Sequence, residues 1–181
     1  MTGMLIRTTC LAWLASSGIA PSETPWQPLR VCEVLDNLPA SEGKVMAIVG
    51  RFSFRESGRF ISEDVCERTG SGSGADPGWP NALRVVFDPK SGPPLPPKVE
   101  FDAPATYQRL KLIKQRTALG RFRFGSVEYD RWAVIFGRIE ASVAFKTGDK
   151  PAGNRKNSFD PAPAQMVCRG ESAILVLAEP Q

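Results

Sequence analysis

Histidine is absent from the 181 residues of this chain, and its absence excludes several functional classes at once. Ser-His-Asp and Cys-His hydrolases, histidine general bases and His-ligated zinc sites all require an imidazole. Any catalysis would have to use carboxylates, lysine, tyrosine or cysteine. We therefore expect no catalytic residues of the common hydrolase types.

A strong excess of one charge is missing as well. The chain has 23 basic and 19 acidic residues and a formal net charge of +4. Such a small surplus is compatible with nucleic acid or anionic lipid as a partner, but it does not argue for either. No apolar run approaches the roughly 20 residues of a membrane-spanning helix, so we expect no membrane span. We treat the chain as a monomer.

Proline, in contrast, is abundant. The chain contains 16 proline and 16 glycine residues, and proline exceeds its usual share of about 5%. This composition favours long loops and short regular elements over a helical bundle. The length suits one domain with a tail.

The N-terminus has the layout of a secretory signal peptide. Arg7 is the only charge, the apolar stretch Cys10–Ala15 follows, and small residues come next. We expect a signal peptide at 1–20, a Pro-rich linker at 21–28 and one OB-like barrel domain at 29–181. The protein would then be periplasmic or secreted. A disordered or core-packed N-terminus is the alternative.

Three cysteines remain after that segment, namely Cys32, Cys66 and Cys168. An oxidising compartment favours one disulfide, and we prefer Cys32 with Cys66 because both flank the first expected hairpin. Three buried thiols acting as small apolar side chains are the alternative. Because no Cys-x-x-Cys pair occurs, we expect no zinc centre, redox centre or cofactor.

Two long apolar segments, each interrupted by a glycine, are the clearest strands. Lys44–Phe54 contains Gly50, and Tyr129–Phe145 contains Gly137. A glycine inside a strand commonly marks a bulge or sharp bend, as a small barrel needs. The letters IVGRF around the first glycine are echoed by IFGRI around the second. We interpret the echo as two strands that must bend alike, not as a domain repeat.

Shorter elements complete the expected fold. Further strands are expected at Arg59–Val65, Ala82–Phe87, Ala164–Cys168 and Ser172–Ala178, and helices at Leu29–Leu38 and Pro104–Leu119. Pro39 should end the first helix, and Tyr107, Leu110 and Ile113 should form the buried stripe of the second. The last strand should be buried on both faces.

The order of these elements predicts the fold class. Five strands with a helix between the third and fourth is the order of the OB-fold. We therefore expect an all-β protein with one or two helices, folded as an OB-like five-stranded barrel. A small β-sandwich decorated by the helix is the alternative.

An ordered series of motifs accompanies these elements. It consists of Val31–Leu35, Gly43–Val45, Val49–Arg51, Cys66, Val134–Arg138 and Pro163–Val167. The series resembles a group of exported, uncharacterised bacterial proteins with an OB-like core. Members of that group often carry a His-containing, Gly-rich stretch before the closing strand, where this chain has Ser158–Ala162. The resemblance implies a fold and a compartment, and no activity.

Arginine and phenylalanine alternate on the first expected hairpin. The candidate ligand-binding residues there are Arg51, Phe52, Phe54, Arg55, Arg59 and Phe60, and a second run, Arg121–Phe124, precedes the fourth strand. On an OB barrel, bases stack on aromatic rings while cations follow phosphates. The simpler interpretation, which we favour, is that the rings fill the barrel and the arginines face water.

Three acidic residues surround one of the cysteines. Glu63, Asp64 and Glu67 lie beside Cys66, and their carboxylates could hold a hard cation such as calcium. Their spacing matches no loop with a defined ligand order. We therefore expect a solvated strand end and assign no metal residues.

The nearest approach to a catalytic set is Tyr107, Lys111 and Lys114, whose spacing equally suits an ordinary amphipathic helix. We therefore predict a non-catalytic exported binding module for a protein, glycan or small ligand. Single-stranded nucleic-acid binding is the first alternative, although nucleic acid is an unlikely partner for an exported protein. An unrecognised His-free hydrolase is the second alternative.

Overall fold

The computed structural model describes residues 25–66, 80–96, 100–120, 128–147 and 162–177. The expected signal peptide, Glu67, the Arg121–Phe124 run and residues 158–161 lie outside these ranges.

Five strands close into a barrel. They are β2 (Val45–Arg55), β3 (Gly58–Ser62), β4 (Ala82–Phe87), β5 (Tyr129–Ala141) and β6 (Ala164–Cys168). The order β2-β3-β4-β6-β5 is closed by pairing of β5 with β2, and only the β4–β6 pair of this ring is parallel. Helix α3 (Ala103–Lys114) lies between the third and fourth of these strands. The predicted OB-like, all-β fold is confirmed.

Two short strands extend the sheet beyond the barrel. β1 (Leu29–Arg30) pairs with β2 in parallel, and β7 (Ile174–Val176) pairs with β5 after a 3₁₀ turn, Glu171–Ala173. The expectation of a last strand buried on both faces is wrong, because Leu175 and Val176 are 48% and 54% exposed. Among the described strands, β7 lies at the end of the strand order and pairs with β5 alone. Leu175 and Val176 point to opposite faces of this edge strand, and both faces are open to solvent.

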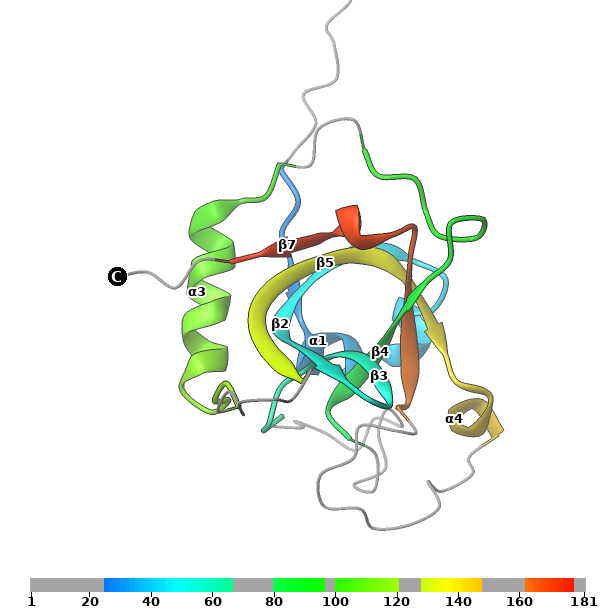
Figure 1. Ribbon diagram of the computed structural model, residues 1–181, viewed down its shortest axis with the longest axis horizontal. Coiled ribbons are helices and arrows are strands. Elements are labelled where there is room, and N and C mark those ends of the chain that lie inside the picture. The colour runs from blue at the N-terminus through cyan, green and yellow to red at the C-terminus, as the bar shows by residue number, and fades with distance from the viewer. Residues whose placement is uncertain (1–24, 67–79, 97–99, 121–127, 148–161, 178–181) are drawn as a thin grey trace, which may run out of the picture.

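Gly50 and Gly137 lie where the two long strands change partner. β2 pairs with β1 before Gly50 and with β3 after it, while β5 pairs with β7 before Gly137 and with β6 after it. Ile48 pairs with Ile135, so each glycine follows this central pair by two residues. The sequence echo therefore reflects two equivalent positions, and β5 bends in a wide arc around the barrel (Figure 1).

Close approach of the neighbouring strand, not unusual backbone geometry, explains both glycines. Neither has a positive φ. A Cβ on Gly137 would lie 2.7 Å from the carbonyl oxygen of Val167, and one on Gly50 would lie 2.9 Å from Cγ1 of Ile61. A side chain at Gly137 would therefore meet the backbone of β6, and one at Gly50 would meet the side chains of Ile61 and Val31.

The barrel interior is filled by one apolar core, into which two short helices pack. α1 (Val31–Asp36) and α2 (Leu38–Ser41) insert four residues among the inward side chains of the strands. The four are Val31, Val34, Leu35 and Leu38.

The predicted helix Leu29–Leu38 is therefore divided, since Leu29–Arg30 forms β1. Pro39 does not end a helix as expected, because it lies in the first turn of α2, where a missing N–H costs nothing.

A second core lies between α3 and the outer face of β2 and β5, and α3 lies outside the curved β5 ribbon (Figure 1). Leu110 and Ile113 pack there against Trp132 and its neighbours. The prediction that Tyr107 belongs to the buried stripe is wrong, because Tyr107 is 45% exposed. Thr106 is buried instead, because four residues, about one turn, separate it from Leu110.

Trp26 falls in the expected linker, yet its side chain packs against both cores. It forms an isolated bridge with Phe101, and its ring meets that of Phe136 edge-on at 5.0 Å.

The C-terminal end of β5 differs from the prediction. The expected strand Tyr129–Phe145 stops at Ala141, which forms the last pair with β6, and α4 (Val143–Thr147) follows. None of the helices in the described ranges has the length and apolar character of a bilayer span.

Candidate binding surface

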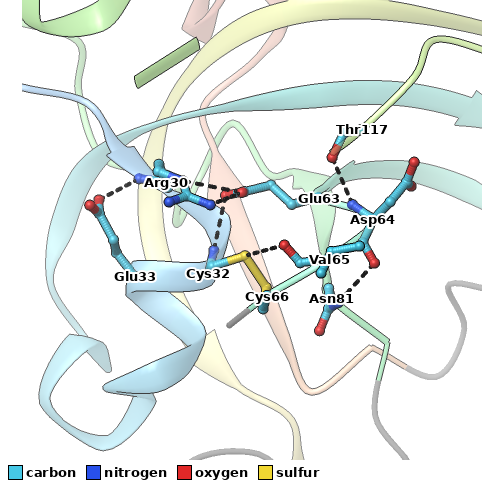
Figure 2. Close-up of a disulfide and its surroundings, with 9 residues drawn as sticks. All are labelled: Arg30, Cys32, Glu33, Glu63, Asp64, Val65, Cys66, Asn81 and Thr117. Atoms are coloured by element: carbon cyan, nitrogen blue, oxygen red, sulfur yellow. Dashed lines mark hydrogen bonds and ion pairs between the residues drawn. A yellow bond between two sulfur atoms is a disulfide. The ribbon is translucent and has the colours of Figure 1, made fainter. Parts of the chain in front are cut away.

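A disulfide fastens the start of α1 to the segment after β3 (Figure 2). It joins Cys32 and Cys66, the pairing preferred from the sequence. Beside it, Glu63 accepts hydrogen bonds from the Arg30 guanidinium at 2.6 Å and from the Cys32 amide at 3.1 Å. Glu63 is buried. The expected solvated strand end is therefore wrong for Glu63, because its charge is paired inside the fold.

Asp64 neutralises the first of the candidate arginines. The buried Arg51 lies 2.6 Å from the Asp64 carboxylate and donates to the carbonyl of Ala118 at 2.7 Å. The Asp64 amide in turn donates to the hydroxyl of Thr117 at 2.9 Å (Figure 2). In the described ranges, no group of three acidic or cysteine residues is placed to hold a metal ion. Glu63 and Asp64 therefore hold the segment after β3 to α1 and to the segment after α3.

Arg55 is neutralised in the same way. Its guanidinium lies 2.5 Å from the buried carboxylate of Asp130, which also accepts a hydrogen bond from the Gly120 amide at 2.6 Å. Burial disfavours ionisation of Asp130. However, the Ser53 hydroxyl, the Gly120 amide and the Arg55 guanidinium together hold the Asp130 pKa below its ordinary value.

The candidate phenylalanines also differ in exposure. Phe52 is part of the barrel core, and Phe60 has no exposed surface. Phe54 is half-buried, as is Arg59. Of the six candidate residues, these two thus remain as the best-placed for contact with a ligand.

Phe54 and Arg59 belong to a stacked set that we name the aromatic–arginine row. Its members are Arg131 and Tyr129 of β5, Phe54 of β2, Arg59 of β3 and Phe87 of β4. The rings of Phe54 and Tyr129 are parallel, with centroids 5.6 Å apart. The Arg59 guanidinium lies 5.2 Å from the Phe54 centroid and 4.7 Å from that of Phe87, and Arg131 lies 5.8 Å from that of Tyr129.

Strand pairing places the row at one end of the barrel. Phe54 is the register partner of both Tyr129 and Arg59, and it lies two residues beyond the core residue Phe52. The row therefore continues the inward face of the strands to the β2–β3 turn. There Tyr129 is 39% exposed, and Arg131 is exposed.

Sequence reasoning missed Tyr129, Arg131 and Phe87. The alternation of Tyr129 and Arg131 at the start of a predicted strand was the available signal. Its importance depends on the β2–β5 register, because that register brings Tyr129 onto Phe54.

The residues of α3 considered for catalysis lie outside the aromatic–arginine row. Lys114 lies over the Trp132 ring, 5.5 Å from its centroid, at the interface of helix and barrel. Tyr107 faces solvent on the same helix.

Comparison of this chain with protein-family models, curated proteins and solved structures finds no match.

Proposed function

We propose that this chain is a non-catalytic, exported binding module of the OB type, whose contact surface is the barrel end that carries the aromatic–arginine row. The observation behind this proposal is the partial exposure of a continuous stack of rings and guanidinium groups. Tyrosine and arginine are enriched at protein interfaces and among the residues that dominate binding energy.

The arginines of the row differ from those inside the fold. Arg51 and Arg55 each have a carboxylate within 2.6 Å. Arg59 has the exposed carboxylate of Glu171 at 3.7 Å, and Arg131 donates to the carbonyl of Asp130 at 3.0 Å. The positive charge of the row is therefore weakly compensated and available to an acidic partner.

The composition of the row supports binding more than catalysis. Catalysis needs a nucleophile, a base and an oxyanion donor within reach of each other. Three rings and two guanidinium groups supply contact area and charge. The Cys32–Cys66 disulfide and the resemblance to exported proteins support an oxidising compartment.

The two tyrosines of the chain provide a matched test. Tyr129 is 39% exposed within the row, and Tyr107 is 45% exposed on α3. The full chain is titrated with four labelled probes, namely an acidic peptide, a thymidine oligonucleotide, an acidic polysaccharide and a neutral polysaccharide. We expect Y129A to weaken binding of at least one probe about fivefold or more. Y107A should leave binding unchanged. Equal effects of both variants, or none, would remove the proposal.

A further inference from the structure

We infer that the aromatic–arginine row recognises the carboxylates of an acidic peptide segment in a partner protein. This inference rests on the proposed function and names the chemistry of its ligand.

Arg59 is the residue best arranged to bind a carboxylate. Its guanidinium lies over the rings of both Phe54 and Phe87, which hold the planar group in place. Its acidic neighbour is Glu171, whose side chain is 81% exposed and whose oxygen is 3.7 Å away, beyond hydrogen-bond distance. The N–H groups of a held guanidinium form a fork that matches the two oxygens of a carboxylate.

The same stacking disfavours ligands that need a free ring face. Two neighbours from strands on opposite sides of β2 already occupy the Phe54 ring: the Tyr129 ring stacks on it, and the Arg59 guanidinium lies over it. Bases bind such surfaces by stacking on exposed aromatic faces. Around Phe54, the row offers a ligand the edges of its rings and the N–H groups of Arg59. A carboxylate can use these groups without displacing a ring.

The size of the row suits one short extended peptide. Successive groups from Arg59 through Phe54 and Tyr129 to Arg131 are 5.2, 5.6 and 5.8 Å apart, so the two guanidinium groups are at most about 17 Å apart. Because each residue of an extended peptide rises about 3.3 Å, roughly five residues cover this distance. One peptide with several acidic residues can therefore reach both arginines.

Glu171 is an internal competitor for the same guanidinium. Because it is exposed and its contact is long, a ligand carboxylate can displace it at small cost. Removing its charge should therefore strengthen binding, an effect opposite in direction to that of mutations in the row.

The test uses fluorescence anisotropy of the full oxidised chain with a labelled Glu-Gly repeat peptide. Its neutral counterpart is a Gln-Gly repeat of equal length. We expect the Glu-Gly peptide to bind and the Gln-Gly peptide not to bind, with affinity falling as salt rises. R59K keeps the charge but loses the planar fork, and it should weaken binding about tenfold. E171Q should tighten binding roughly 1.4- to 5-fold.

A second ion pair supplies the controls. Arg138 and Glu140 lie 2.8 Å apart and are partly exposed on β5, outside the row. R138K and E140Q should leave the affinity unchanged. Equal binding of the two peptides, or an unchanged affinity in R59K, would overturn the inference.

The outcomes for the inference and the proposed function are distinguishable. If the oligonucleotide binds in a Tyr129-dependent way and the acidic peptide does not, the inference fails and the binding surface stands. If Y129A changes the binding of no probe, both fail.

Discussion

The disulfide between Cys32 and Cys66 should contribute a large part of the stability of this fold. The double variant C32A/C66A removes it without leaving either of its two thiols unpaired. The bond closes a loop with a sequence separation of 34, so the chain-entropy relation gives a loss of about 3.8 kcal/mol at 25 °C. Domains of this size are stabilised by roughly 5–15 kcal/mol, so the variant should still fold.

Local contacts explain why α1 should keep its place without the disulfide. Glu63 still accepts hydrogen bonds from the Arg30 guanidinium and the Cys32 amide. Val31 and Val34 still pack in the barrel core. The loss should therefore lower the free energy of unfolding while the native fluorescence of the four tryptophans remains similar.

Urea unfolding followed by tryptophan fluorescence measures this difference. Adding reductant to the original chain should lower its stability by a similar amount, and reductant should not affect the double variant. A loss below about 1 kcal/mol, or an equal response of both proteins to reductant, would show that the disulfide is not a major source of stability.

Three further predictions concern single residues. G137A should cost about 1–3 kcal/mol in urea unfolding because its Cβ would meet the Val167 carbonyl oxygen at 2.7 Å, whereas G170A, with no atom within 4 Å, should be near neutral. Because folding lowers the Asp130 pKa, the Asp130 charge stabilises the fold above pH 3.8, and this stability is lost as the pH falls through the lowered pKa. In D130N, the free energy of unfolding should therefore fall less steeply as the pH is lowered. Burial raises the Cys168 pKa to about 12, so mass spectrometry should find this thiol unmodified by iodoacetamide at pH 8 until the protein is unfolded.

Local pattern was enough to predict the barrel. The two glycine-interrupted segments follow from apolar runs and turn residues, and the preference for pairing Cys32 with Cys66 follows from their places beside the first hairpin. The same patterns could not show why the glycines are needed, because the Val167 carbonyl that approaches Gly137 lies on another strand.

The binding surface could be predicted only in part, because acidic residues far away in the sequence decide which of its arginines are neutralised. Arg51 and Arg55 resemble free cations in the sequence, yet Asp130 pairs with Arg55 from 75 residues away. Phe54 was found by local alternation, while Tyr129 joins it through the register of β2 with β5. Pairings between such distant segments are not encoded in any short window of sequence.

The most direct test of the proposed surface is a titration of the isotope-labelled chain with the Glu-Gly peptide, followed by amide chemical shifts. We expect the largest shifts at the amides of Phe54, Arg59 and Tyr129, at one end of the barrel. Shifts concentrated on α3 or β7, with these three amides unmoved, would show that the peptide binds elsewhere.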